Sequence, residues 1–504
     1  MRKLIDEEIR AAWTREKIVP SPRADDAVFL RRVYLDLVGT IPTYDEARAF
    51  LADPDPHKRA KLIDRLLDDP RFATHQADVW DLVLFGRHPA GGEDTRKRPA
   101  FKKWLADKFA QNVPYDQWVR ELLQGEEDGS QVYYVQYRNQ PEEAAVGVSR
   151  VFLGTQLHCA RCHDHPYENW TQRDFYGMAA FFVRLVVLEE GSGAQKRFRI
   201  AEKSTGEVLF SGAAKDQRPG KKGEPVKPKF LGGEELEEPP VPKDFKEPDF
   251  RKVKEPPRPL FSRKEKLAAW VTAPDNPYFA RALANRLWAQ FLGRGLVHPV
   301  DDLSDKNTPS HPRLLEALTA HLRTHKFDVK SLIREIVNSE TYQLAGTGPE
   351  TRALPLWFER APVRPLTAEQ LLASLRTATG FDAAGGKIGG DTIEYLTRFF
   401  GEPTNGQGEF QASLSEHLFL NNSHHLRQMI QPRKENLAHI LLTAPASWEE
   451  RVDRLFLSVL SRPPSAAERQ RFVQHLTSDP QAAPALVEEA IWALVSCSEF
   501  RFNH

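Results

Sequence analysis

Two of the three cysteines of this 504-residue chain stand in the segment Cys159-Ala160-Arg161-Cys162-His163. The pattern C-x-x-C-H is typical of covalent haem c attachment. Each thiol adds to one vinyl group of the haem, and the histidine that follows is carried beneath the iron as its proximal ligand. We therefore predict a haem c site in which Cys159 and Cys162 hold the porphyrin and His163 binds the iron.

The sequence indicates the sixth iron ligand less clearly than it indicates the two cysteines and His163. Met178, one of two internal methionines, is the candidate because a thioether is a known axial ligand of haem c. His158 and His165 stand so close to the motif that reaching the opposite haem face is difficult. His75 and His88 are further candidates, and a five-coordinate iron stays open.

Zinc is the competing interpretation of the same segment. Cys159, Cys162, His163 and His165 offer nitrogen and sulfur donors, which suit a tetrahedral zinc ion. Such a knuckle usually needs a second ligand pair, and Cys497 is the only other thiol, so histidines or carboxylates would have to supply it. A reduced, buried thiol pair is a third interpretation. A thioredoxin-like role is disfavoured because no βαβ pattern surrounds the motif.

A second polar group lies far along the chain. Its members are Asn285, Arg286, Arg294, Asp301, Asp302, Asn307, Ser310 and His311. Asp301, Asp302 and His311 with the two arginines have the residue types of a binding or acid/base site, so a hydrolase that uses the His311 region is one hypothesis. The favoured interpretation is structural: Asp301, Asp302 and Ser310 cap helices, and Arg286 and Arg294 pair with the aspartates.

Helical periodicity surrounds both groups. The sequence predicts a mainly α protein with two helical domains, residues 3–188 with the C-x-x-C-H motif and residues 261–504. Thr43 and Glu46 form a capping-box pattern at one helix start, and another helix is expected over 174–187. Residues 189–260 are predicted to hold a β-hairpin over 197–210 and a linker rich in Pro, Lys and Glu that buries little.

Composition excludes several classes of protein. Lys+Arg and Asp+Glu both number 70, so the formal charge is 70 − 70 = 0, which argues against a dedicated nucleic-acid binder. Three cysteines exclude a disulfide framework. The most apolar stretch, 177–188, is too short to span a bilayer and contains Arg184. No apolar region of a signal peptide is visible in the first residues, so we expect either a cytoplasmic protein or a leader that the given sequence does not include.

Three stretches together carry a family resemblance. They are Leu30–Leu37 with Gly39–Thr43, Phe152–Tyr176 around the C-x-x-C-H motif, and a third set comprising Asn285–Trp288, Gly293–Gly295, Pro309–Pro312 and Ser498–His504. The chain resembles the planctomycete cytochrome-like domain followed by the planctomycete-specific C-terminal domain, both domains of unknown function. The resemblance extends over nearly the whole chain and is weakest in the Pro-rich middle.

The resemblance implies an exported, periplasmic or similarly located protein with c-type cytochrome character. It also implies a redox partner protein or a link to polysaccharide-degrading machinery, without an established reaction. Our first hypothesis is therefore a monohaem electron-transfer or redox protein. The alternatives are a zinc-stabilised helical binding or scaffold protein and the hydrolase, so whether the chain is an enzyme stays open, as does its oligomeric state.

Overall fold

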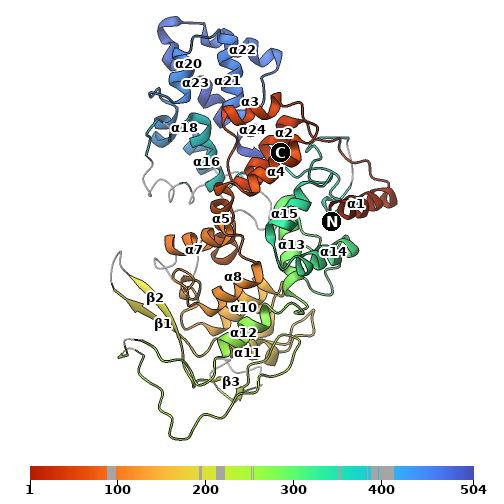
Figure 1. The fold of residues 1–504 in the computed structure, drawn as a ribbon, viewed down its shortest axis with the longest axis vertical. Coiled ribbons are helices and arrows are strands. Elements are labelled where there is room, and N and C mark those ends of the chain that lie inside the picture. The colour runs from red at the N-terminus through yellow and green to blue at the C-terminus, as the bar shows by residue number, and fades with distance from the viewer. Residues whose placement is uncertain are drawn as a thin grey trace. The chain divides into compact units, whose positions relative to one another are not determined.

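The computed structural model describes residues 1–87, 98–191, 196–211, 222–250, 252–253, 255–349, 353–382, 384–387, 396 and 414–504. These residues form a mainly α-helical protein, as predicted, and their strands pair only in small two-stranded antiparallel sheets (Figure 1). Among the described helices, none combines the length and the apolar character needed to cross a membrane.

The chain divides into two compact units, and each unit takes segments from distant parts of the sequence. Unit 1 comprises Met1, Ala77–Gln290 and Arg294–Ile333, and unit 2 comprises Arg2–Gln76, Phe291–Gly293 and Arg334–His504. The predicted domains, 3–188 and 261–504, rest on composition and periodicity along the sequence. The units rest on contacts in space, so their boundaries fall at other residues.

Unit 1 carries the helices on both sides of the C-x-x-C-H motif. Its core includes an aromatic cluster in which Trp118 packs edge-on against Trp80 and Tyr115, and Tyr115 stacks on Phe279 with ring centroids 4.9 Å apart. Phe279 belongs to the C-terminal half of the sequence, so both halves build this core. The helices of unit 1, including three that also enter unit 2, are α5 (Pro70–Phe85), α7 (Pro99–Ala110), α8 (Tyr115–Gln124), α9 (Val132–Val135), α10 (Pro141–Phe152), η1 (His158–Arg161), α11 (Gln172–Ala179), α12 (Arg263–Val271), α13 (Phe279–Leu292), α14 (Pro312–Thr324) and α15 (Val329–Val337).

The hairpin predicted over 197–210 is wrong. β2 (Arg197–Glu202) pairs with β1 (Leu185–Glu190), and β3 (Val208–Phe210) pairs with β4 (Glu224–Val226). Six residue pairs join β1 to β2, whereas β3 has only three residues. The longer strand is the better partner because it offers β2 a full ladder of hydrogen bonds and cross-strand side-chain pairs.

The helix predicted over 174–187 is likewise only partly correct. α11 ends at Ala179, and the chain then continues into strand β1. The β-branched side chains of Val186 and Val187 favour extended backbone, and pairing with β2 gives that preference a partner.

The Pro-rich segment that follows belongs to unit 1 and packs against its helices. Phe230 stacks between Phe181 and Trp270, with ring centroids 5.1 Å from each. Lys229 forms an ion pair with Asp174 of α11 at 2.6 Å. Most residues of 222–250 are exposed, as expected of this composition, and a few aromatic and ionic contacts fix the segment to the helices.

Unit 2 contains the N-terminal and C-terminal helices and, within it, α20–α23 lie side by side (Figure 1). The predicted capping box is confirmed: Thr43 accepts from the Glu46 backbone N–H, and the Glu46 side chain accepts from the Thr43 N–H. The remaining elements of unit 2 are α1 (Arg2–Glu16), α2 (Asp26–Val38), α3 (Tyr44–Ala52), α4 (Lys58–Leu67), η3 (Pro355–Trp357), β5 (Arg364–Pro365), α16 (Ala368–Thr379), α18 (Leu414–Asn422), α19 (His424–Ile430), α20 (Leu437–Thr443), α21 (Trp448–Leu460), α22 (Ala466–Leu476), η4 (Pro480–Ala482), α23 (Ala483–Ser496), α24 (Ser498–Arg501) and β6 (Phe502–Asn503).

One buried histidine of unit 2 makes its stability depend on pH. Burial lowers the pKa of His75 to about 4. The ring lies against Gly39, where an added Cβ would be 2.5 Å from His75 Nδ1. Between the unfolded-state pKa of about 6.5 and the folded-state value, the unfolded chain binds more protons, so stability falls as the pH falls.

We expect acidification from pH 7 to pH 5 to cost about 2 kcal/mol through His75 alone. Urea unfolding at both pH values, compared between the parent and His75→Gln, measures this difference. The variant should lose that much of the pH dependence, whatever its stability at pH 7. An identical pH dependence in the two proteins would contradict the prediction.

Candidate functional site

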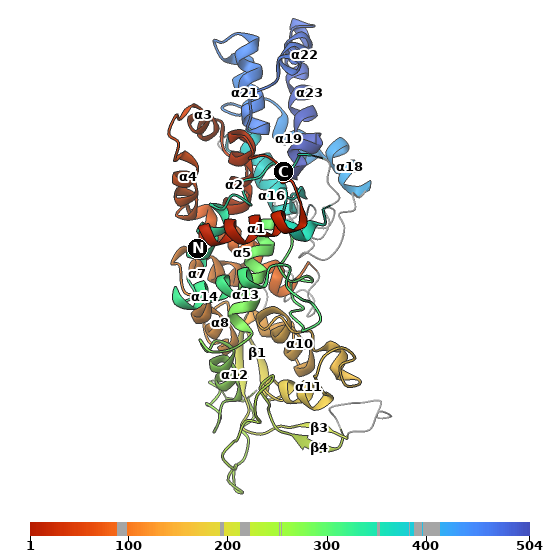
Figure 2. The ribbon, with the colours of Figure 1, turned by 90° about the vertical axis from the view of Figure 1, so that its right-hand side faces the viewer.

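The C-x-x-C-H motif occupies the connection between α10 and α11, two helices that lie next to each other in unit 1 (Figure 2). Its first residues form the 3₁₀ turn η1, closed by a bond from the Cys162 N–H to the Cys159 carbonyl at 3.4 Å. Side chains three residues apart eclipse each other in a 3₁₀ turn. Both thiols are exposed, so Cys159 and Cys162 are presented together at the surface.

The ring of His163 has a defined protonation pattern. Its Nδ1 lies 2.8 Å from the backbone oxygen of Asp164. A carbonyl oxygen only accepts hydrogen bonds, so Nδ1 carries the proton and donates it. The lone pair of the neutral ring is then on Nε2, the pattern found in metal-binding histidines whose Nδ1–H is held by a carbonyl.

His165 has the opposite pattern. Its Nδ1 accepts from the backbone N–H of Glu168 at 3.0 Å and from that of Tyr167 at 3.3 Å. The proton of the neutral ring is therefore on Nε2, and the Nδ1 lone pair is already used. In this conformation His165 supports the loop and has no lone pair to give to a metal ion.

Hydrogen bonds to α11 and within the loop fix the rest of the motif. Arg161 O accepts from the Tyr176 hydroxyl at 3.1 Å and from the Gln172 side-chain amide at 3.3 Å. The Gln172 backbone N–H donates to the Asp164 carboxylate at 2.9 Å. The His165 N–H donates to Trp170 O at 2.7 Å. The short turn is therefore positioned by α11 together with bonds within its own loop.

The candidate sixth ligands occupy different places. Met178 is fully buried in α11, whereas His158 is exposed beside the exposed thiols. His75 belongs to unit 2 and the motif to unit 1. His88 lies outside the described residues. The structure therefore does not place the Met178 thioether at the surface where the thiols are.

The second polar group lies next to the motif, although more than a hundred residues separate the two in sequence. Asp301 accepts from the side-chain amide of Gln156 at 3.3 Å and forms an ion pair with Arg150 at 3.4 Å. The Leu303 N–H donates to Gly154 O at 2.8 Å. Neither Arg150 nor Gln156 belongs to a recognisable sequence pattern, so both were missed by reasoning from the sequence.

Burial shifts the pKa values of several charged side chains in this region. Burial lowers the pKa values of Arg286 and Arg294, and the charge of Asp301 acts in the opposite direction on Arg286. Burial also raises the pKa of Glu168, and Asp302 and Asp305 raise it further. Asp302 therefore acts on the motif loop through its charge.

Other members of the group have structural roles. Asn285 is fully buried and binds the backbone of the following loop through Val297 and Val300. Ser310 does not cap α14: its hydroxyl donates to Leu296 O at 3.2 Å, and its N–H donates to the same oxygen at 2.8 Å. His311, only 5% exposed, places Nδ1 3.0 Å from the Ser310 hydroxyl.

Within the described part of the chain, no group of three or more His, Cys, Asp or Glu side chains is arranged to hold a metal ion. Comparison with known proteins gives no match among the curated proteins and none among the solved structures.

Two protein families do match. Residues 4–186 match PSCyt2, a protein of unknown function (DUF1549), and residues 263–398 match PSD1, a protein of unknown function (DUF1553). This confirms the arrangement of two successive domains of unknown function and leaves the cytochrome character as a prediction. The chain thus joins a PSCyt2 region that contains the C-x-x-C-H motif to a PSD1 region that contains the Asp301 and His311 group.

Proposed function

We propose that this chain is a c-type cytochrome-like redox protein that carries one haem on Cys159 and Cys162, with His163 as an axial ligand. The observation that carries the proposal is the contrast between the two histidine rings. His163 has its lone pair on Nε2, while His165 uses its Nδ1 lone pair within the loop. This favours one histidine ligand beside two thiols over a four-donor zinc site.

The donor set fits the group. Covalent attachment needs two accessible thiols with matched spacing, and both thiols are exposed on one 3₁₀ turn. The bound haem would supply one-electron exchange between iron(II) and iron(III). The residues of the chain would tether it, supply the nitrogen ligand and fix the orientation of that ligand through the Asp164 carbonyl.

Haem c is attached outside the cytoplasm, so the proposal includes export of the protein. The test is to direct the chain to the periplasm of a host that matures c-type cytochromes and to record a pyridine haemochrome spectrum with metal analysis. We expect about one covalent haem per chain, and complete loss of it in Cys159→Ala/Cys162→Ala.

Cys497→Ala is the matched control, because this third cysteine is partly buried and belongs to unit 2, whereas the motif belongs to unit 1. It should retain the haem. An exported, folded protein that binds one zinc ion and no haem would overturn the proposal. So would a protein with neither haem nor zinc.

A further inference from the structure

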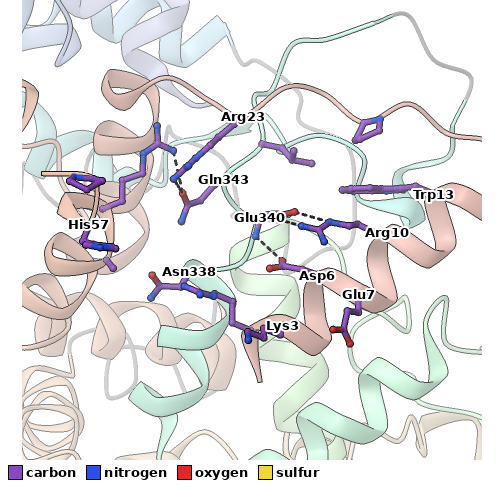
Figure 3. Close-up of a pocket in the computed structure, with 16 residues that line it drawn as sticks. Lys3, Asp6, Glu7, Arg10, Trp13, Arg23, His57, Asn338, Glu340 and Gln343 are labelled. Atoms are coloured by element: carbon purple, nitrogen blue, oxygen red, sulfur yellow. Dashed lines mark hydrogen bonds and ion pairs between the residues drawn. The ribbon is translucent and has the colours of Figure 1, made fainter. Parts of the chain in front are cut away.

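A pocket in unit 2 is lined by residues that take no part in the chemistry proposed above, and it has no assigned role. It has a volume of about 850 Å³, within the range of small-molecule sites. Its walls are α1, the beginning of α4 and the segment that follows α15 (Figure 3). Figure 3 shows Arg23 and Gln343 on one side of it and Asp6, Arg10 and Glu340 on the other.

The first side of the pocket holds two arginines with little compensating negative charge. Arg23 donates to the Gln343 side-chain oxygen at 2.9 Å, and Arg59 donates to the same oxygen at 3.2 Å. A neutral amide therefore stands between two guanidinium groups. Among the residues that the structure describes, Arg23 has no carboxylate partner.

The nearest carboxylate on this side is shared by other cations. Asp26 pairs with Arg59 at 2.7 Å and with Lys58 at 2.8 Å. Asp26 thus serves two positive charges, and Asp25 also acts on Arg59 through its charge. Arg23 adds a third positive charge. Arg59 is only 9% exposed, and the charge of Arg23 contributes to lowering its pKa. The like charges are therefore close enough to act on each other.

Two of the three carboxylates that line the second side, Glu340 and Asp6 but not Glu7, have hydrogen-bond or ion-pair partners among the described residues. Glu340 pairs with Arg10, with Arg10 Nε 2.9 Å from a carboxylate oxygen. Asp6 accepts from the Glu340 backbone N–H at 2.8 Å. These bonds reduce the negative potential that this side presents, so the first side keeps its positive character.

Backbone pairing holds the cationic side in place. The Ala24 N–H donates to Gln343 O at 2.9 Å, and the Ala345 N–H donates to Pro22 O at 2.8 Å, so the Arg23 segment runs antiparallel to the Gln343 segment. Arg23 and Gln343 therefore lie on paired strands of backbone. Such preorganisation lowers the entropy cost of binding a ligand.

We propose that this pocket binds a small organic anion through a phosphate or carboxylate group held by Arg23 and Arg59. The fork of N–H donors on a guanidinium matches both groups. The rest of the volume would receive the remainder of the ligand, and the side chains of Asn338 and Asp6 would offer hydrogen bonds to it. The proposal is independent of haem attachment.

The test is isothermal titration of the full chain with inorganic phosphate and, separately, with malonate, at constant ionic strength kept by chloride. Constant ionic strength removes general charge screening as an explanation. We expect saturable binding of at least one probe at one site per chain. Phosphate binding alone would assign a phosphate ligand, and malonate binding alone a carboxylate ligand. Binding of neither would overturn the proposal.

Gln343→Glu is the decisive variant, because it keeps the shape of the side chain and places a carboxylate between Arg23 and Arg59, where it would compete with a bound anion. We expect it to weaken binding at least tenfold while the melting temperature is kept. Arg23→Gln should weaken binding by a similar factor, because it removes one of the two arginines that hold the anion. Arg23 is exposed, so its removal leaves the core intact. Arg48→Gln makes the same charge change at an exposed site in α3 and should leave binding unchanged. Equal affinity in Gln343→Glu and the parent, or equal weakening by Arg48→Gln, would overturn the proposal.

Discussion

His163→Ala is expected to retain haem on both cysteines and to lose the imidazole-ligated spectrum completely. The thiols are unchanged in this variant, so the covalent links still form, but the iron has lost its nitrogen donor. Axial ligands set haem potentials over a range of about 0.8 V, so the reduction potential should shift as well. The measurement is visible spectroscopy with redox titration of the exported protein, and added imidazole should restore the spectrum.

His165→Asn is the matched control. An asparagine side-chain oxygen accepts readily from backbone N–H groups two or three residues ahead, as His165 Nδ1 does here. The loop should therefore keep its shape, and the spectrum should equal that of the parent. Loss of the imidazole spectrum in His165→Asn together with its retention in His163→Ala would reverse the assignment of the ligand.

Arg263→Met is expected to destabilise unit 1 by about 3 kcal/mol. Arg263 is 1% exposed, pairs with Glu207 and Glu238, and donates to the Ala180 carbonyl at 2.9 Å. Removing the guanidinium of Arg263 leaves the negative charges of its two glutamate partners less well neutralised. The effect falls at the lower end of the usual range because both glutamates keep some solvent access and also pair with Arg184.

Hydrogen exchange measured by mass spectrometry tests this, because it reports stability segment by segment. α12 and residues 222–250 should exchange faster in Arg263→Met than in the parent. Lys266→Met is the control, an exposed position one turn along α12, and it should change stability by less than about 0.5 kcal/mol. Equal exchange in both variants would show that the ion pairs do not hold this segment.

Local rules located many helices correctly. Thr43 and Glu46 act as a capping box, and Asp328 accepts from the Ser331 N–H at the start of α15, because a cap needs only residues three positions apart. The same local rules did not predict the strand pairing correctly. β2 pairs with the preceding β1 and not with β3. Ser204 and Thr205, which lie between β2 and β3, donate their N–H groups to the Glu247 carboxylate and do not close a hairpin. The pairing depends on residues brought near by the fold.

The sequence by itself determined the helical character and the position of the C-x-x-C-H motif, since each depends on spacing over a few residues or on composition. The conformation of the motif loop decided which ring nitrogen of His163 and of His165 carries the proton, because backbone groups one to three residues away contact each ring. Tertiary structure alone decided the contact of Asp301 with Arg150 and the pocket shared by Arg23, Arg59 and Gln343. Those groups come from segments far apart in the chain, and only packing brings their charges within interaction distance.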